Sequence, residues 1–171
     1  MTVGRSDDAS VCRLDILRER YGHRAQWTET VRYEVRRGLA GAPYLQDVLD
    51  AIWLNEPIEI SGSPAVLTEI NNIRRGLGAT PGEETQHLGE AEIIYHLQFV
   101  DIGGFFVTDD QPALDFARRR GVAGFDTRRI MEECYAVHEV GCPEAFNLLQ
   151  QMYLLDRGVR MPASHAEVCP R

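Results

Sequence analysis

The chain has 171 residues, of which 44% are apolar and 26% charged, an ordinary composition for a globular domain with its own hydrophobic core. The 18 basic residues stand against 26 acidic ones, so the formal net charge is −8. A charge of this sign argues against tight, non-specific binding to nucleic acid. It does not exclude an enzyme that cuts RNA, because acidic metal ligands lower the total and a bound cation reverses the local field.

Four cysteines, Cys12, Cys134, Cys142 and Cys169, are spread along the chain without a C-x-x-C pair. This spacing indicates neither a zinc knuckle nor a redox motif. We therefore expect free thiols and a location in the reducing cytoplasm. No apolar run approaches the roughly 18 residues of a membrane span, and no signal peptide is expected.

The hydrophobic pattern divides the chain into three parts. Residues 1–12 are poorly patterned, residues 13–160 form one domain, and residues 161–171 form a flexible tail. Within the domain, amphipathic helices alternate with short apolar strands, which is the order of an α/β fold with a parallel sheet. The expected helices, in chain order, cover residues 14–21, 28–39, 43–54, 63–77, 90–100, 112–120, 126–140 and 143–157. The expected strands cover residues 24–27, 58–60, 104–108 and 122–125.

Local signals mark several helix boundaries. Thr28 is placed to cap the helix that follows it, and either Asp126 or Thr127 is placed to cap a later one. Ser63-Pro64 puts proline at the first position of a helix, where its missing N–H costs nothing. Gly121 is expected to end the helix that precedes it.

Two neighbouring segments carry acidic residues at positions where ligand sites form. Glu90 lies in the first turn of a helix. The next apolar strand ends in Thr108, Asp109 and Asp110. Strand ends and helix starts of an α/β fold meet at one edge of the sheet, so acids from the two segments are expected to meet there and hold a hard divalent cation. The pattern predicts a metal-dependent hydrolase site, with a phosphodiester as the favoured substrate.

Each of these residues also has a structural explanation. An acid in the first helical turn is favoured by the helix dipole, so Glu90 can be there for stability alone. Aspartate is a good helix cap, and one of Asp109 and Asp110 can serve the following helix in this way. Thr108 either orients a metal-bound water or simply completes the strand.

Further candidates are weaker when taken alone. Glu34 lies in the middle of a helix, where a salt bridge to Arg32 or Arg37 is the alternative to a place in the same cleft. The arginine clusters at Arg118 and Arg128 either coat a solvated helix end or hold a phosphate backbone. The histidines show no paired spacing of the kind that metal motifs use, and we expect them on the surface or in the core. They are His23, His87, His96, His138 and His165.

Five segments, taken in order, resemble a known family. They are residues 14–22, residues 30–35, Gly89-Glu90-Ala91-Glu92, Val107-Thr108-Asp109-Asp110 and Ala117-Arg118-Arg119-Arg120-Gly121. The set resembles the PIN-domain ribonucleases, and more narrowly the PIN-like toxins of bacterial toxin–antitoxin pairs. The resemblance covers residues 13–160, and the ordered set is more specific than any single motif.

The resemblance implies a three-layer α/β/α sandwich around a small parallel sheet. It implies an acidic site that activates water for RNA cleavage, with Glu34, Glu90 and Asp110 as catalytic acids. The same resemblance implies Mg²⁺ or Mn²⁺ as the cofactor, held by Glu90, Asp109 and Asp110.

The resemblance also implies partners. The expected function is that of a metal-dependent endoribonuclease acting as a toxin, with an RNA substrate and a small antitoxin protein as its partners. Thr108 and Arg118 are the expected substrate contacts. The oligomeric state stays open, with a homodimer as one possible assembly, and no contact with a membrane is expected.

The chain departs from the family pattern at the first strand. PIN-like families begin with an apolar strand that ends in Asp, but nothing apolar precedes Asp7 and Asp8. Two explanations stay open: residues 8–11 are a degraded form of the motif, or the chain starts after that strand. In the second case the fold lacks its first strand and the site lacks its first acid. The alternative function is then a non-catalytic PIN-like binding module with an incomplete acidic site.

A phosphatase-like hydrolase is disfavoured because a D-x-D nucleophile motif is absent.

Overall fold

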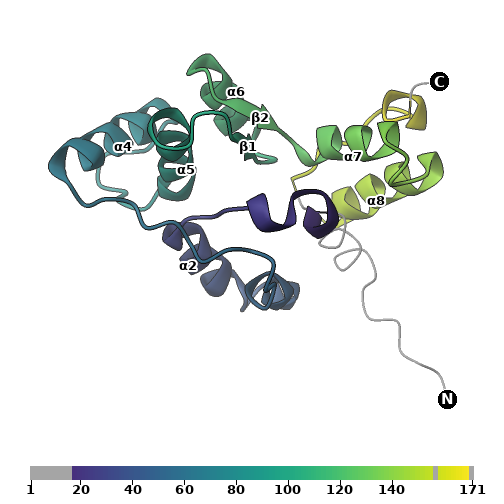
Figure 1. Cartoon of the computed structure of the whole chain (residues 1–171), viewed down its shortest axis with the longest axis horizontal. Helices are drawn as coiled ribbons and strands as arrows, with labels where there is room; N and C mark the ends of the chain where they lie inside the picture. Colours follow the sequence, from purple (N-terminus) through teal and green to yellow (C-terminus); the bar gives the residue numbers. More distant parts are fainter. Residues whose placement is uncertain (1–16, 156–157, 170–171) are drawn as a thin grey trace. The chain divides into compact units, whose positions relative to one another are not determined.

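The computed structural model of the chain describes residues 17–155 and 158–169 (Figure 1). The chain divides into two compact units, Met1–Glu59 and Ile60–Arg171. The boundary between them falls inside the domain that the sequence predicts over residues 13–160.

The first unit is built from short helices. Its elements, in chain order, are a helix over residues 17–21, η1 (Gly22–Arg24), α2 (Glu29–Gly38), η2 (Pro43–Leu45) and α3 (Gln46–Leu49). The predicted N-cap of α2 is confirmed, because the hydroxyl of Thr28 accepts a hydrogen bond of 3.4 Å from the amide of Val31. The candidate first-strand motif at Asp8 lies outside the described residues.

In place of the strands predicted over residues 24–27 and 58–60, the structure has one isolated β-bridge. Thr28 and Ile58 form an isolated parallel bridge, and the amide of Ile58 donates to the carbonyl of Trp27 at 2.8 Å. The prediction of two regular strands in this unit is therefore wrong, since a bridge of one residue pair replaces them.

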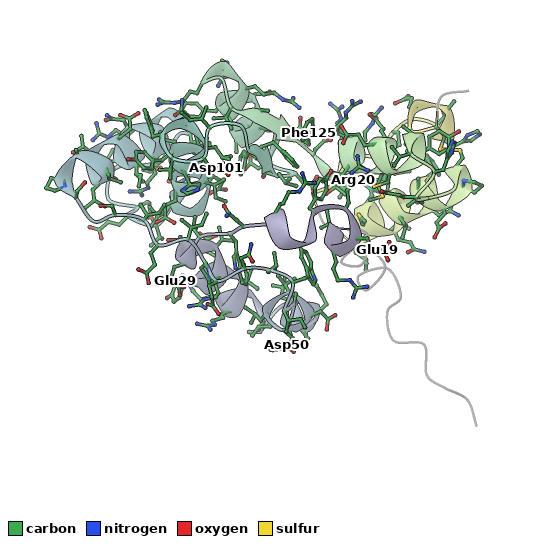
Figure 2. All side chains as sticks on the ribbon, in the orientation of Figure 1. Glu19, Arg20, Glu29, Asp50, Asp101 and Phe125 are labelled. Carbon is green, nitrogen blue, oxygen red and sulfur yellow. A yellow bond between two sulfur atoms is a disulfide. The ribbon has the colours of Figure 1, made fainter. Side chains whose placement is uncertain are left out.

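The helix predicted over residues 43–54 is wrong in its second half, because α3 stops before Asp50, its C-cap (Figure 2). The chain turns there to reach the bridge with Thr28. The indole of Trp27 holds the returning segment by donating to one of its carbonyls at 2.9 Å. Ile52 lies in this turn and is fully exposed, although it falls within the helix predicted over residues 43–54.

The second unit contains a parallel sheet. Its elements, in chain order, are α4 (Pro64–Gly76), α5 (Leu88–Phe99), β1 (Phe105–Val107), α6 (Gln111–Arg119), β2 (Ala123–Phe125), α7 (Thr127–Ala136), α8 (Cys142–Leu154) and η3 (His165–Glu167). β1 and β2 pair in parallel with Phe106 opposite Gly124, and α6 connects them. The rings of Phe105 and Phe125 lie edge to face, with their centroids 5.0 Å apart. The predicted α/β class with a small parallel sheet is confirmed, although the described residues are mostly helical and their sheet has two strands.

One hydrophobic core joins α4, α5, α6 and the sheet. α4 packs against α5, and both α5 and α6 contact β1. The buried members of this core are Ile70, Ile73, Ala91, Ile94, Phe106, Ala113, Ala117 and Val122. Burial of these apolar side chains fixes α5 and α6 against the end of β1. The first turns of the two helices, which carry the predicted acids, are thereby held in place.

Two further helix starts agree with the sequence. The hydroxyl of Ser63 accepts from the amide of Val66 at 3.4 Å at the start of α4. Asp126 is the N-cap of α7, because its carboxylate accepts from the amide of Arg129 at 2.8 Å. These bonds satisfy donors that the first helical turn leaves unpaired. The sequence leaves open whether Asp126 or Thr127 is the N-cap, and in the structure it is Asp126.

α7 ends at Ala136, before the end that the sequence predicts at Val140. His138 takes a left-handed backbone conformation with φ 63°, and the amide of Glu139 then donates back to the carbonyl of Cys134 at 2.9 Å. This geometry is usually provided by glycine, so the sequence carries no ordinary stop signal at this point.

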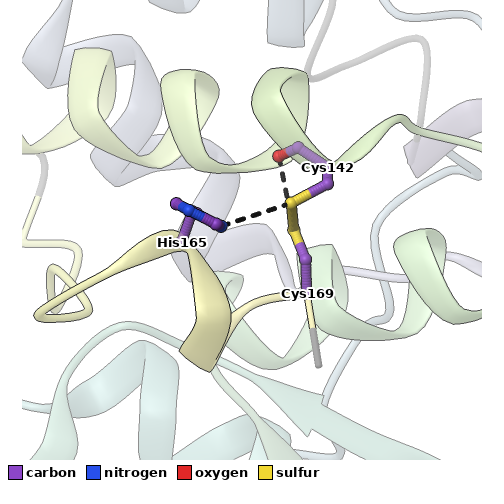
Figure 3. The surroundings of a disulfide bond; sticks show 3 residues. All are labelled: Cys142, His165 and Cys169. Atoms are coloured by element: carbon purple, nitrogen blue, oxygen red, sulfur yellow. Dashed lines mark hydrogen bonds between the residues drawn. A yellow bond between two sulfur atoms is a disulfide. The ribbon is translucent and has the colours of Figure 1, made fainter. Parts of the chain in front are cut away.

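The last described segment is tied to α8. Cys142, at the start of α8, and Cys169 form a disulfide whose Cα atoms are 5.5 Å apart (Figure 3). Nδ1 of His165 lies 3.8 Å from Sγ of Cys142. The expectation of free thiols is wrong for this pair, and the cysteines no longer argue for a reducing compartment. The segment that the sequence assigns to a flexible tail includes η3, and its Val168 is fully buried.

Among the described residues, no helix combines the length and the apolar character that crossing a lipid bilayer requires.

Candidate metal centre

The first part of the candidate site is the link between β1 and α6. The amide of Thr108 donates to the carbonyl of Phe125 at 3.1 Å and extends the strand pairing by one residue. The hydroxyl of Thr108 accepts from the amide of Asp110 at 3.1 Å. Asp110 is in turn the N-cap of α6, with Oδ1 accepting from the amide of Ala113 at 2.9 Å. These bonds fix both the backbone and the carboxylate of Asp110.

The second part is the start of α5. His87 is the N-cap residue, and Glu90 is the third residue of the helix. His87 has a left-handed backbone conformation (φ 57°, ψ 22°), and its side chain makes no capping hydrogen bond. Its Nδ1 lies 3.9 Å from Oε1 of Glu90. Side chains at the N-cap and at the third helical position are neighbours in the first turn, which explains this proximity.

The two parts meet at one point of the second unit. One possible ligand atom from each of His87, Glu90 and Asp110 lies within 4.8 Å of the other two, and we call these three residues the acid–imidazole cluster. The side chains of His87 and Glu90 are 25% and 30% exposed, and Asp110 is exposed, so the cluster opens to solvent. The structure thus brings together Glu90 and Asp110, as the placement of helix start and strand end predicts.

The acid–imidazole cluster does not include Asp109, the remaining ligand expected from the sequence. The amide of Thr127 donates to Oδ1 of Asp109 at 2.8 Å, and the hydroxyl of Thr127 donates to Oδ2 at 2.7 Å. Asp109 therefore joins the end of β1 to the first turn of α7, where its charge also interacts favourably with the helix dipole. The two adjacent aspartates thus serve different helices.

The other residues expected at the site have local partners or lie in the first unit. Arg118 donates from Nη2 to the carbonyl of Gly124 at 2.8 Å and so ties α6 to β2. Thr108 completes the strand pairing and holds the amide of Asp110. Glu34 lies on α2 in the first unit. The catalytic role of Glu34 and the substrate contacts of Thr108 and Arg118 stay predictions.

A buried arginine fixes the loop that leads into the cluster. Arg74, on α4, is 9% exposed. Its Nε donates to the carbonyl of Gln86 at 2.9 Å, its Nη1 donates to Oδ1 of Asn71 at 3.0 Å, and its Nη2 donates to the carbonyl of Glu83. Hydrogen bonds from a charged donor are stronger than neutral ones, and here they also satisfy the buried guanidinium. Because Gln86 precedes His87 directly, Arg74 fixes the backbone at the edge of the cluster.

Replacing Arg74 by methionine is expected to lower the free energy of unfolding by about 3 kcal/mol, because the carbonyls of Glu83 and Gln86 lose a charged donor. Urea or thermal unfolding of the purified chain measures this change. Arg75→Met is the matched control, since Arg75 is the next residue on α4 and is exposed; its expected change is below about 0.5 kcal/mol. Equal losses in the two variants would show that the Arg74 contacts do not hold the loop.

The donor set of the cluster fits a divalent cation. Carboxylate oxygens suit Mg²⁺, Ca²⁺ and Mn²⁺, and imidazole nitrogen suits first-row transition ions. Donors that each lie about 2.1 Å from one cation are about 3 Å apart at neighbouring positions and about 4.2 Å apart on opposite sides. The ligand atoms lie within 4.8 Å of one another, so binding by all three residues requires their partly exposed side chains to close by up to about 2 Å.

Comparisons of the chain with protein-family models, with curated proteins and with solved structures found no match. A proposal about function therefore depends on the cluster itself and on the sequence motifs that surround it.

Neither His87 nor Arg74 is among the residues that the sequence predicts at the site. The signal for His87 is present as His87-Leu88-Gly89-Glu90, a spacing that brings an N-cap side chain beside one in the first turn. This spacing differs from the paired histidines of common metal motifs. Arg74 has no comparable signal, because its burial depends on the loop of residues 78–86 folding back over α4.

Proposed function

We propose that this protein is a divalent-cation-dependent hydrolase that cleaves phosphodiester bonds in RNA. The observation that carries the proposal is the convergence of Glu90 and Asp110, from separate segments, within 4.8 Å of each other and of His87. The resemblance of the same motifs to PIN-like ribonucleases supports it. The three-layer α/β/α arrangement, the role as a toxin and the small antitoxin partner belong to the same proposal.

In this proposal, Glu90 and Asp110 hold the cation and do not attack the substrate. Oδ1 of Asp110 accepts from the amide of Ala113, and an ionised carboxylate keeps further acceptor sites for a cation. Thr108 acts as a positioning residue through its hydrogen bond to the amide of Asp110. A bound divalent cation would supply Lewis-acid stabilisation of charge on the phosphate and a more readily ionised water. The opening of the cluster to solvent suits a polymeric substrate, which has to approach from outside.

The test is cleavage of a panel of structured RNAs by the purified full-length chain. Parallel samples contain Mn²⁺, Mg²⁺, or EDTA, and a last sample receives excess Mn²⁺ after EDTA. We expect cleavage with a cation, none with EDTA, and recovery after the cation is restored, because the charge on the scissile phosphate is stabilised only by the bound ion. Undiminished cleavage in EDTA would contradict the proposal.

A non-catalytic PIN-like binding module is the second candidate, and one observation favours it. Both carboxylate oxygens of Asp109 are bonded to Thr127, which leaves two carboxylates in the cluster where the sequence leads us to expect three. This candidate predicts cation binding without cleavage. Running the RNA assay at a cation concentration that calorimetry shows to be saturating separates the two functions.

A further inference from the structure

The cluster contains an imidazole beside its two carboxylates. We infer that His87 is a metal ligand and makes the cluster selective for a first-row transition cation over Mg²⁺ and Ca²⁺. This inference rests on the proposed function, because it concerns the same cation site. It assigns a ligand that neither the family resemblance nor the pattern of acids provides.

The position of His87 supports a role as a ligand. Its Nδ1 lies 3.9 Å from Oε1 of Glu90, and one of its ring nitrogens lies within 4.8 Å of the ligand atoms of Glu90 and Asp110. Residues at an N-cap usually use their side chain to accept from the helix amides, and the side chain of His87 does not. Its contribution to α5 comes from the backbone, since its carbonyl accepts from the amide of Ala91 at 3.1 Å. The imidazole therefore lies beside the carboxylate of Glu90 and does not cap the helix amides.

Hydrogen bonds within the protein hold the backbone on both sides of the cluster. Arg74 donates to the carbonyl of Gln86, directly before His87, and thereby holds the loop against α4. Asp110 is held by Thr108 and by its capping bond to α6. Sites in which supporting hydrogen bonds orient the ligands lose less entropy on binding and discriminate better between ions. Arg74 and Thr108 are positioning residues for the cluster.

The chemistry of the donors determines which cation is preferred. Mg²⁺ favours oxygen donors and gives up its waters reluctantly, whereas Mn²⁺, Co²⁺ and Zn²⁺ accept an imidazole nitrogen. One nitrogen and two carboxylates therefore form a mixed set in which the nitrogen adds affinity for transition ions and little for Mg²⁺. We expect the wild-type chain to bind Mn²⁺ at least about tenfold more tightly than Mg²⁺.

The experiment is calorimetric titration of the metal-free, full-length chain with Mn²⁺ and with Mg²⁺. The variants are His87→Ala and His87→Asn; asparagine adopts the left-handed conformation of residue 87 readily, so this variant keeps the backbone while it removes the ring nitrogen. His138→Asn is the matched control, because His138 is also a left-handed histidine (φ 63°) and is not part of the cluster. Pulsed electron paramagnetic resonance of bound Mn²⁺ adds a direct readout, because it detects a coordinated nitrogen.

We expect both His87 variants to bind Mn²⁺ at least about tenfold more weakly, with Mg²⁺ binding changed by less than about twofold and the nitrogen signal lost. His138→Asn should behave like the wild type. If the His87 variants keep wild-type Mn²⁺ affinity while Glu90→Gln loses it, the inference about His87 is overturned and the proposed function survives. If the wild-type chain binds neither cation, the proposed function fails and the inference fails with it.

Discussion

Replacing Glu90 by glutamine is expected to abolish cation-dependent RNA cleavage while the protein stays folded. The amide keeps the size of the side chain but removes the charge that would attract a divalent ion, and it leaves only Asp110 and His87 as charged or nitrogen donors in the cluster. We expect the cleavage rate to fall by roughly two orders of magnitude or more. Removing one group that stabilises charge in a transition state usually has an effect of this size. The rate is compared with that of the wild type on the RNA that gives the highest rate in the cleavage assay, at the same Mn²⁺ concentration.

The melting temperature of the metal-free variant distinguishes a site residue from a structural one. Clustered carboxylates repel each other when no ion is bound, so neutralising Glu90 removes a repulsion from Asp110. The favourable interaction of Glu90 with the α5 dipole opposes this gain by about 0.3–1 kcal/mol. We therefore expect an unchanged or higher melting temperature. Glu92→Gln, on the same helix, is the control and should cleave RNA as the wild type does. A clear fall in melting temperature for Glu90→Gln would instead assign Glu90 a purely stabilising role.

Loss of the Cys142–Cys169 disulfide is expected to have the largest effect on stability. The bond spans a sequence separation of 27 residues, and the chain-entropy model gives about 3.5 kcal/mol for a loop of this size. For a protein of this length, such a loss lowers the melting temperature by roughly 7–14 °C. The measurement is thermal unfolding of the wild type and of Cys142→Ser/Cys169→Ser, each with and without a reductant.

The single variants provide the control for this prediction. Cys142→Ser and Cys169→Ser each break the same bond, so the double variant should be little less stable than either one. The reductant should destabilise the wild type and leave the double variant unchanged. Thiol titration under denaturing conditions should show that reduction releases two more thiols in the wild type than in the double variant. Additive losses in the two single variants would mean that the sulfurs stabilise the protein separately.

Helix starts could be predicted where a residue caps the helix that it precedes. Thr28, Ser63 and Asp126 each accept a hydrogen bond from an amide three residues on, so the signal and its effect lie within one turn. The parallel pairing of β1 and β2 followed from two apolar runs joined by a helical segment. These features depend on short stretches of sequence, and the structure agrees with them.

The predictions that failed depend on contacts between distant residues. A bridge at Thr28 replaces the strand expected at residues 24–27, because the partner segment pairs with the chain here only at Ile58. The end of α7 depends on a left-handed histidine, His138, where the sequence offers no glycine. The pairing of Cys142 with Cys169 depends on the folding of the intervening chain, which cysteine spacing alone does not specify.

At the site, too, some features could be predicted from the sequence, and others depend on contacts between distant residues. The convergence of Glu90 and Asp110 was predictable, because the topology of an α/β unit brings helix starts and strand ends together. The separate tasks of Asp109 and Asp110 were not, because adjacent aspartates present the same signal and only the position of Thr127 distinguishes them. The place of His87 in the cluster depends on its left-handed backbone conformation, which is uncommon for residues other than glycine and is not predicted by the sequence.

The disulfide also determines how mechanical force enters the fold. A pull on the backbone that follows Cys169 passes through the two sulfur atoms to Cys142, at the start of α8. The load therefore bypasses α8 and η3, because the disulfide carries it around the residues between the two cysteines. The first helix to bear the load is α7, whose start is anchored by Asp109 and Asp126.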